Sequence, residues 1–526
     1  MRRGAGTRAP LPLVLAAGLV VAALLLPLAY LVVRVASGGR TLEILGEPST
    51  WRLVWNTVLL AAGVVVASTL VAVPTAWIVT RTDVPARRVW AAAAALPLVI
   101  PSYVAAFCLL GFFGPRGILA DAVGVEQLPD VKGYWGALAA LTLATYPYVF
   151  LLTAAALRGL DPALEDAARG LGESGGRIFL RVTAPALRPA VGLGALLVVL
   201  YTFSDFGVVS LMDYDTLTRA IYIQYKSLFD RAPAATLALL LVGLTAIALV
   251  LEYRTRRRGR LYRSGPGSAR PLPVVPLGRW TVPALAFCAA VVTLFLVLPA
   301  GVLGYWLVHG IANERELGLP WSEALHSLEA SSLAAGIAVL AALPVALLAL
   351  RYPSTTSHTF ERLSYAGNAL PGLVIALSLV FFAARYATPV YQTLALLVFA
   401  YVVRFFPQAL SGVESALERV SPRYEEAARG LGRGPLQTLG RVTVPLARSG
   451  ILAGAALVFL SAMKELPATL LLRPIGFETL ATEIWKLTQV GAYSQAAVPA
   501  LALIVVSAPI AYLVAAERPV ESGGTG

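Results

Sequence analysis

The sequence has few of the side chains that form disulfides or hold soft metal ions. Its 526 residues include two cysteines, three methionines and three histidines. Both cysteines, Cys108 and Cys288, lie within apolar runs and support no disulfide framework. The scarcity of histidine and sulfur ligands argues against a haem or soft-metal site.

Charged side chains are also scarce. They make up 13% of the chain and hydrophobic residues 58%, whereas soluble globular chains have about 25% charged residues. The apolar residues form runs such as 11–33, 53–80, 234–251 and 282–308, each long enough to cross a hydrocarbon layer of about 30 Å. A soluble enzyme, a disordered chain and a disulfide-rich domain are therefore excluded, and the sequence indicates a helical protein with many membrane spans.

Hydropathy predicts an all-α membrane protein with twelve transmembrane helices. The expected spans are residues 11–35, 53–80, 90–113, 136–157, 190–212, 234–252, 281–308, 328–350, 364–384, 390–413, 449–472 and 496–516. Residues 1–8 resemble the basic start of a signal peptide. The apolar run after them is long for such a peptide and has no clear cleavage site, so we expect an uncleaved first span.

The net charge of +13 comes from arginine, since only four of the 42 basic residues are lysine. A basic balance can indicate nucleic-acid binding, but these arginines lie in short loops between spans, as the positive-inside rule describes. With the N-terminus in the cytoplasm, the inner loops and termini hold 28 basic residues and the outer loops 11. We therefore expect both termini in the cytoplasm, the lipid bilayer around the protein and no nucleic-acid partner.

The two halves of the chain are repeats. The hexapeptide AARGLG occurs at 167–172 and again at 427–432, and RVT recurs at the same spacing of 260 residues, at 181–183 and 441–443. Because these matches lie in polar segments, chance similarity between apolar helices does not explain them.

Upstream of these motifs the spacing is 270 residues, as between Pro101 and Pro371. The first repeat therefore has about ten extra residues in the loop after its third span. We predict two parallel six-helix repeats, 1–253 and 281–526, joined by a basic cytoplasmic linker at 254–280.

Each repeat carries a matching inner loop between its fourth and fifth spans. An Asp-Pro pair at 161–162 and a Ser-Pro pair at 421–422 are typical helix starts. Acidic residues follow in the first turns, and paired glycines after them are expected to end each helix. A simple solvated turn has no reason to repeat in such detail, so we interpret the two short helices as docking elements for a cytoplasmic partner.

These loops resemble the E-A-A coupling loop of bacterial ATP-binding-cassette (ABC) importer permeases, in which E-A-A-x-x-x-G precedes I-x-L-P. The matching residues are Glu426, Ala427, Ala428, Gly432 and Pro445 in the second loop and Asp166, Ala167, Ala168, Gly172 and Pro185 in the first. The first loop departs from the pattern at Asp166 and Ala184, which implies weaker docking. The resemblance implies the ABC importer permease fold, with each loop in a cleft of an ATP-binding subunit.

The chain has no pattern for hydrolysing ATP itself. A phosphate-binding loop needs G-x-x-x-x-G-K-[ST], and no glycine precedes any of the four lysines. We therefore expect no catalytic residues and no bound cofactor in this chain, with ATP and Mg²⁺ on two copies of a cytoplasmic ATP-binding subunit.

Residues 204–238 and 464–488 resemble segments of the fused two-repeat ferric-iron permeases, and KELPATLLLRP at 464–474 is the more telling part. With the loops, this resemblance covers nearly all of residues 50–515. It implies iron(III) as the substrate, a substrate-binding protein on the outer face and a place in the bacterial cytoplasmic (inner) membrane.

Asp205 and Glu465 occupy equivalent positions, each late in the fifth span of its repeat. Ionisable groups within a membrane are costly and are functional candidates, and Fe³⁺ prefers carboxylate and phenolate oxygen. We expect the two carboxylates to face each other across a central path and to bind the ion transiently. Tyr146, Tyr148 and Tyr201 are weaker pathway candidates, because tyrosines near span ends usually belong to the interfacial belt.

Two other interpretations of these carboxylates stay open. Glu465 is also placed to form a structural ion pair with Lys464 or Arg404, and both carboxylates are also placed to lie near the outer headgroups. The charged outer segments 213–233 and 473–495 either dock the binding protein or form solvated loops.

Other classes of transporter also stay open. An ABC permease for thiamine, a polyamine or a phosphonate fits the same loops. An ion-coupled secondary transporter often has twelve spans, but the repeated E-A-A loop argues against it. A membrane enzyme would need a catalytic cluster near a span end, and the sequence shows none.

Overall fold

The computed structural model describes residues 9–37, 39–115, 117–125, 128–226, 232–257, 274–313 and 318–516. Eleven of the described helices are long and apolar enough to cross a membrane, or twelve if the bent pair Thr355–Gly367 and Gly372–Tyr386 forms one span. The all-α membrane architecture is therefore confirmed.

The first repeat contains α1 (Leu11–Ser37), α2 (Thr41–Gly46), α3 (Pro48–Arg81), α4 (Arg87–Ala95), η1 (Leu96–Val99), α5 (Ser102–Phe113), α6 (Ile118–Val123), α7 (Tyr134–Arg158), α8 (Pro162–Gly170), α9 (Gly175–Ile178), η2 (Phe179–Thr183), α10 (Ala184–Ser204), α11 (Gly207–Leu211), α12 (Leu217–Lys226) and α13 (Ala232–Arg257). The extra residues of this repeat lie between α5 and α7 and include α6.

The second repeat contains η3 (Gly278–Trp280), α14 (Thr281–Val292), η4 (Thr293–Val297), α15 (Leu298–Ala312), α16 (Trp321–Arg351), α17 (Thr355–Ser364), η5 (Tyr365–Ala369), α18 (Gly372–Tyr386), η6 (Thr388–Val390), α19 (Leu394–Glu418), α20 (Pro422–Gly430), α21 (Pro435–Thr438), η7 (Leu439–Thr443), α22 (Val444–Met463), α23 (Pro467–Leu472), α24 (Leu480–Gln489) and α25 (Tyr493–Ala516). Helices α3, α7 and α10 pack together, as do their equivalents α16, α19 and α22.

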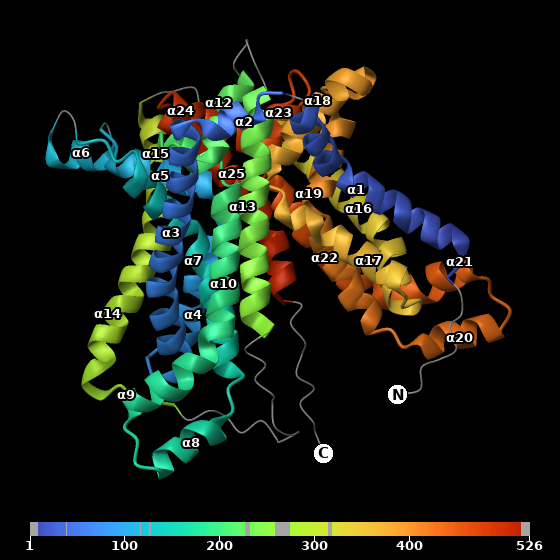
Figure 1. Ribbon diagram of the computed structural model, residues 1–526. Coiled ribbons are helices and arrows are strands. Elements are labelled where there is room, and N and C mark those ends of the chain that lie inside the picture. The colour runs from blue at the N-terminus through green and yellow to red at the C-terminus, as the bar shows by residue number, and fades with distance from the viewer. Residues whose placement is uncertain are drawn as a thin grey trace.

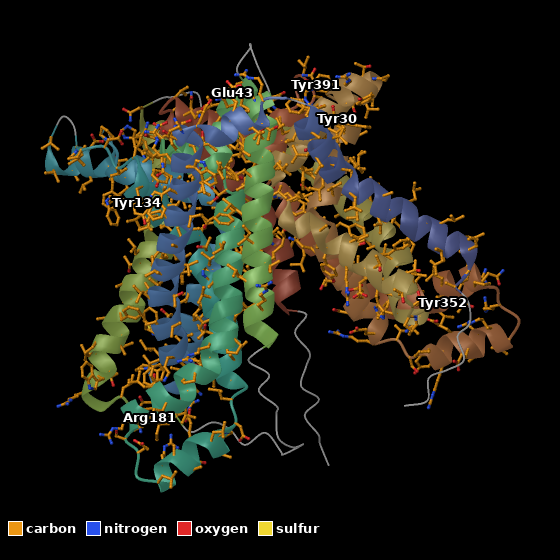
Figure 2. The ribbon with its side chains drawn as sticks, in the orientation of Figure 1. Tyr30, Glu43, Tyr134, Arg181, Tyr352 and Tyr391 are labelled. Carbon is orange, nitrogen blue, oxygen red and sulfur yellow. The ribbon has the colours of Figure 1, made fainter. Side chains whose placement is uncertain are left out.

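The two packed groups lie together near α12 and α24 and diverge toward α8 and α20 (Figure 1). We refer to these as the α12 end and the α8 end of the molecule. Figure 2 shows Arg181 and Tyr352 toward the α8 end, whereas Tyr30, Tyr134 and Tyr391 lie toward the α12 end. Tyrosines near the ends of membrane spans are typical of the bilayer interface.

The first span of each repeat packs mainly on the other repeat. Helix α1 contacts α16, α17 and α18, whereas α14 contacts α3 and α4, and α15 contacts α5 as well as α25 of its own repeat. Figure 1 shows α1 beside the second repeat and α14 beside the first. The repeats are thus exchanged in space, which hydropathy does not reveal because it carries no information on which spans are neighbours.

The expected third spans, 90–113 and 364–384, are broken in both repeats at a proline. The preceding residues, Ile100 (φ −78°, ψ 119°) and Leu370 (φ −100°, ψ 113°), are extended. A proline disfavours the helical conformation of the residue before it and donates no hydrogen bond. In the second repeat the two helices meet at a bend of 99°.

The fifth spans also differ from the expected 190–212 and 449–472. The helices run continuously over Gly175–Ser204 and Pro435–Met463, so they begin earlier and end earlier than expected. Each contains a five-residue π-helical segment, η2 or η7, just before its main α-helical part. Such segments occur frequently at functional sites.

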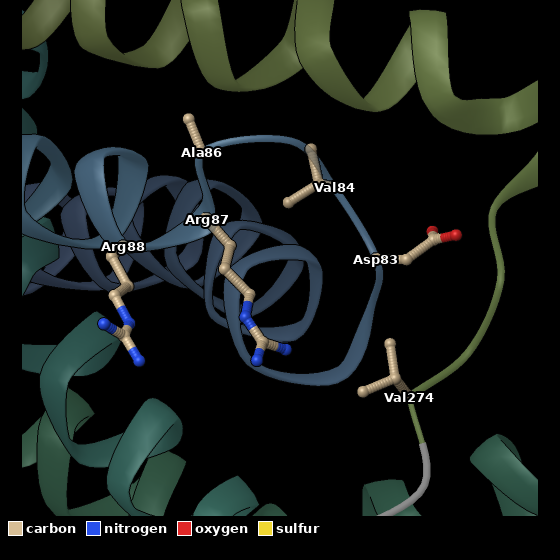
Figure 3. Close-up of a pocket in the computed structure, with 6 residues that line it drawn as sticks. All are labelled: Asp83, Val84, Ala86, Arg87, Arg88 and Val274. Carbon is tan, nitrogen blue, oxygen red and sulfur yellow. The ribbon is translucent and has the colours of Figure 1, made fainter.

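The linker between the repeats is described only at its two ends, and 258–273 lie outside the described residues. Val275 pairs with the end of α3: its backbone N–H donates to the carbonyl of Arg81 at 2.8 Å. Leu277 N–H donates to the Asp83 carboxylate at 2.9 Å. A pocket of about 520 Å³ lies beside this contact. Figure 3 shows Arg87 and Val274 among the residues that line it. The linker is thus attached to the loop after α3.

Candidate functional site

The two predicted docking helices, α8 and α20, have the same local geometry. Asp161 Oδ1 accepts a hydrogen bond from Ala163 N–H at 3.0 Å, and Ser421 Oγ accepts one from Arg423 N–H at 3.4 Å. These capping bonds satisfy backbone donors at each helix start. The expected short capped helices are confirmed.

Both helices end with a glycine in the left-handed region. Gly172 and Gly432 each have φ of +81°. Around them, the N–H groups of Glu173 and Arg433 donate to the carbonyls of Ala168 and Ala428 at 3.1 Å. This six-residue closure is the Schellman motif, which requires a residue that tolerates positive φ.

The described residues of the E-A-A motifs are mostly exposed. The side chain of Asp166 is 55% exposed and pairs with Arg169 at 2.8 Å. Glu426, Ala167 and Ala427 are also exposed, Ala168 is half-buried and Ala428 is buried. Pro185 and Pro445 lie elsewhere, in the first turns of α10 and α22 directly after the π-helical segments.

Two apolar side chains that the sequence analysis did not single out extend from the same turns. Leu171 is 85% exposed and Leu431, its equivalent, is 84% exposed. Leu436 and Tyr424, near α20, are also exposed. Contiguous exposed apolar patches often mark a surface that binds another protein.

Each docking helix also has a buried carboxylate that the sequence analysis missed. Glu165 is 4% exposed, and Arg81 Nη2 lies 2.5 Å from its Oε2. Thr183, the last residue of η2, donates to Glu165 Oε1 at 2.9 Å. This set joins α8 to the end of α3 and to the start of the fifth span.

The second repeat contains the equivalent set. Arg351 Nη2 lies 3.1 Å from Glu425 Oε1, and Thr443 donates to the same oxygen at 3.2 Å. The glutamates and threonines are 260 residues apart and the arginines 270, the same spacings that define the repeats. A comparison of each charged residue with the residue 260 or 270 positions later would have identified the arginines and glutamates of both sets.

The predicted pathway carboxylates lie in the breaks after the fifth spans. Asp205 is 8% exposed; Ser102 Oγ donates to its Oδ2 at 2.5 Å, and Val208 N–H donates to its Oδ1 at 2.9 Å. The hydrogen bond from Val208 N–H ends α10 at Asp205, because the carboxylate offers the backbone an alternative to helical hydrogen bonding.

Glu465 is 6% exposed and forms an ion pair with Arg404, whose Nε lies 3.1 Å from Oε2. One of the alternative interpretations, an ion pair with Arg404, is therefore present in the structure. Lys464 instead donates to the carbonyl of Leu98 in the first repeat at 3.2 Å.

The two breaks lie at the contact between the repeats. A Cβ atom added to Gly207 would come within 2.9 Å of Tyr103 Cβ and 3.1 Å of Leu466 Cδ2. Tyr103 is 3% exposed, and its hydroxyl has no hydrogen-bond partner among the described residues. Residues adjacent to the two carboxylates thus pack against one another across the repeats.

The predicted tyrosines occupy different environments. Tyr201 lies one turn before the end of α10, and its ring lies 6.1 Å from that of Tyr148. Tyr146 is fully buried and donates to the carbonyl of Ala94 at 2.8 Å, so it serves the packing of α7 on α4.

The described residues contain no group of three or more histidine, cysteine, aspartate or glutamate side chains placed to hold a metal ion. The two carboxylates are held by a serine and an arginine.

Beyond the carboxylates, toward the α12 end, aromatic side chains from both repeats meet. The ring of Phe206 lies 4.6 Å from that of Tyr222 and 6.0 Å from that of Trp485. These residues come from the α10–α11 break, α12 and α24, so α12 and α24 cover the end of the contact between the repeats.

Most of the charged residues described in the expected outer segments form ion pairs, one of them with Lys132 in the loop before α7. Lys132 Nζ lies 2.7 Å from Asp213 Oδ2, and this hydrogen bond raises the pKa of Lys132. Arg219 pairs with Asp213 and Asp215, and Arg473 pairs with Glu478. Asp230 and Arg231 lie outside the described residues.

Comparison with known proteins gives a consistent assignment. The family model described as "Binding-protein-dependent transport system inner membrane component" matches residues 68–260 and 336–516, once in each repeat. The Fe(3+)-transport system permease protein FbpB 2 of Haemophilus influenzae is 33% identical over 492 residues, which cover 92% of this chain and 94% of that protein.

Two further relatives differ in extent. The ferric transport system permease protein FbpB of Actinobacillus pleuropneumoniae is 23% identical over 89% of this chain and 71% of its own length. The molybdenum transport system permease protein ModB of Escherichia coli K12 is 30% identical over 38% of this chain and 91% of its own length. ModB thus corresponds to a single repeat.

Proposed function

Because the chain belongs to the family of binding-protein-dependent transport system inner membrane components, we propose that it is the transmembrane subunit of an ABC importer that moves iron(III) into the cytoplasm. The observation that carries the importer assignment is the pair of docking helices α8 and α20, with the same caps, the same closing glycines and protruding leucines. The iron assignment is supported by two relatives whose names state ferric transport.

The partners follow from the same helices. Two docking helices in one chain require two copies of a cytoplasmic ATP-binding subunit, which hold ATP and Mg²⁺ because this chain lacks a phosphate-binding loop. Each helix presents the exposed face of its E-A-A motif together with Leu171 or Leu431 to one ATP-binding subunit. A substrate-binding protein delivers the ion at the opposite end, over α12 and α24.

In the proposed orientation the α8 end lies in the cytoplasm. The excess of arginine in the loops at this end supports that orientation through the positive-inside rule. The described starts of α1 and α14 and the described end of α13 lie toward the same end (Figure 1), which supports a cytoplasmic N-terminus and linker.

Transport proceeds by alternating access. In the described conformation the aromatic cluster of Phe206, Tyr222 and Trp485 closes the outer end, and the repeats diverge toward the cytoplasm. Closure of the two ATP-binding subunits draws α8 and α20 together, which opens the outer end to the binding protein.

Asp205, Glu465 and Tyr201 are the proposed pathway residues. Asp205 and Glu465 are buried carboxylates in unwound segments at the contact between the repeats. When the repeats separate on the outer side, these oxygens become available to a hard trivalent cation. When no ion is bound, Arg404 balances the charge of Glu465.

The test is reconstitution of the chain with its ATP-binding subunit and binding protein in proteoliposomes. We expect ATP-dependent uptake of radiolabelled iron(III) that requires the loaded binding protein, and stimulation of ATP hydrolysis by that protein. Thiamine, a polyamine, a phosphonate and molybdate serve as competing solutes. Uptake of one of these in place of iron contradicts the cargo, and uptake driven by an ion gradient without ATP contradicts the importer class.

A further inference from the structure

The buried glutamates of the docking helices face away from the surface that binds a partner. Glu165 is 4% exposed and Glu425 7% exposed, whereas the residues that follow them, Asp166 and Glu426, are exposed. Their carboxylates contact the chain's own spans. Their function therefore differs from docking.

We propose that Glu165 and Glu425 are positioning residues that transmit a displacement of each docking helix to the membrane-spanning helices. The first link is Arg81–Glu165–Thr183 and the second is Arg351–Glu425–Thr443. This inference rests on the proposed function, because it requires that ATP-binding subunits displace α8 and α20.

The first link holds three elements at one carboxylate. Glu165 Oε2 binds Arg81 at the end of α3, at 2.5 Å, and Oε1 accepts from Thr183 in the π-helical segment before α10, at 2.9 Å. Along the chain, α8 is joined to α7 and α9 by the short connections 159–161 and 171–174. The link therefore adds a direct contact to two spans.

The strength of the link comes from its burial. The side chains of Arg81 and Glu165 are 4% and 6% exposed. Separating such a pair leaves uncompensated charge away from water, which is strongly unfavourable, whereas an exposed pair costs little to break. A movement of α8 therefore carries the end of α3 with it.

The second link reaches one more span. Arg351 Nη2 donates to Glu425 Oε1 at 3.1 Å and also to the carbonyls of Leu417 and Val420, at 3.3 Å and 3.0 Å. Both carbonyls belong to the end of α19 and the turn after it. Glu425 is thus connected to α16, α19 and α22.

The two links differ in the hydrogen bonds that the arginine makes besides its ion pair. The carbonyl of Arg81 accepts from Val275 N–H in the linker between the repeats, and no bond from its side chain to the end of α7 is present in the described part of the chain. The second link therefore couples its docking helix to the spans more completely. We expect loss of Glu425 to impair coupling at least threefold more than loss of Glu165.

The test compares the amount of iron imported per ATP hydrolysed, because a folding defect lowers both activities together whereas a broken link lowers their ratio. In the reconstituted full complex, Glu165→Gln combined with Glu425→Gln is expected to lower this ratio at least tenfold while two ATP-binding subunits still co-purify. Glu418→Gln, at an exposed carboxylate at the end of α19, is the control and should leave the ratio unchanged.

A second variant tests the link if the double glutamate variant does not assemble. Thr183→Val with Thr443→Val keeps the shape and both ion pairs, and is expected to lower the ratio two- to fivefold. Exchange of the charges in Arg81→Glu with Glu165→Arg should recover part of the coupling that Glu165→Arg alone removes.

The outcomes separate the two proposals. A wild-type complex in which ATP drives no iron uptake contradicts the proposed function. A coupled wild-type complex whose assembled Glu165→Gln, Glu425→Gln variant keeps the wild-type ratio contradicts the link alone. If that variant does not assemble, the threonine variant is the test, and a wild-type ratio in it contradicts the link.

Discussion

Lys464 of the second repeat donates a hydrogen bond from Nζ to the backbone carbonyl of Leu98 in the first, at 3.2 Å. The residue at the equivalent position of the first repeat is Ser204, which is too short for the reciprocal bond. The contact between the repeats is therefore asymmetric beside Asp205 and Glu465, although the two backbones follow the same course.

Replacement of Lys464 by methionine should weaken the contact between the repeats. A hydrogen bond to a charged group contributes about 1.5 to 3 kcal/mol, and the Leu98 carbonyl would lose this donor. We expect a lower thermal midpoint of the purified complex and a higher ATPase rate without binding protein. Lys486→Met, at a lysine whose side chain is 60% exposed, is the control; equal midpoints for the two variants would contradict the prediction.

Bulky residues at the closing glycines should uncouple transport while membrane insertion continues. Leucine at Gly172 and Gly432 would be held at φ of +81°, at a cost of about 1 to 2 kcal/mol each, so the turn after each docking helix would change shape. We expect ATP-driven uptake to fall at least tenfold at a normal amount of chain in the membrane.

The matched control for this variant is alanine at Gly170 and Gly430. Neither glycine has positive φ, and an added Cβ would meet nothing within 4 Å at either site. Full transport in the leucine double variant would show that the shape of this turn does not matter for coupling.

The exposed leucines of the docking turns should contribute directly to binding the ATP-binding subunit. Serine at Leu171 and Leu431 removes apolar area that contributes about 25 cal/mol per Å² when buried, and we expect the affinity for the subunit to fall at least tenfold. Ile475→Ser is the control, since Ile475 is 90% exposed in the loop after α23. Titration of detergent-solubilised chain with the subunit measures both; equal affinities would place docking elsewhere.

Loss of both pathway carboxylates should abolish iron uptake. Asp205→Asn with Glu465→Gln keeps the shape of both side chains but removes the charge that attracts Fe³⁺, and we expect uptake to fall at least tenfold. Because Glu465→Gln leaves Arg404 without a counter-charge, the variant should also be made with Arg404→Met. Normal iron uptake by the Asn/Gln variant would assign the two carboxylates to structure alone.

A methyl group at Gly372 should disrupt the Glu465–Arg404 pair. A Cβ there would come within 2.5 Å of Glu465 Oε1 and 3.0 Å of Arg404 Nη1, and overpacking of this kind costs about 1 to 3 kcal/mol. The equivalent residue is Ser102, which faces the shorter Asp205. Glu465→Asp should therefore restore the thermal midpoint lost in Gly372→Ala, and Gly336→Ala, with open space around it, should have no effect.

The repeats and the short capped helices α8 and α20 could be predicted from the sequence because short, recognisable patterns mark both. The caps at Asp161 and Ser421 and the glycines at 172 and 432 act within a few residues of one helix. The same geometry therefore follows from the same short pattern in both repeats.

The links at Glu165 and Glu425 could not be predicted in the same way. Each depends on an arginine more than seventy residues earlier in the chain, and nothing near the glutamate indicates that it is buried. In the sequence, Glu165 and Asp166 look like equivalent acidic residues of a first helical turn. Their opposite environments follow only from the way α8 lies on the ends of α3 and α10.

The breaks at Asp205 and Glu465 were hidden for a related reason. Hydropathy continues across them, so it predicts a single span to 212 or 472. The carboxylate of Asp205 binds the N–H of Val208 and starts a new short helix, a competition between side chain and backbone that averaging over a window does not detect.

The exchange of first spans has a consequence for how the protein is made. Helix α1 is synthesised first, but the helices on which it packs, α16, α17 and α18, emerge from the ribosome only after the whole first repeat. During that interval α1 faces lipid in the bilayer, and among the first repeat's helices it packs on α13. The long apolar surface of α1, which includes the exposed Leu11, Leu15 and Leu19, is compatible with contact with lipid during this time. Assembly of this transporter is thus completed late in translation, when the second repeat arrives.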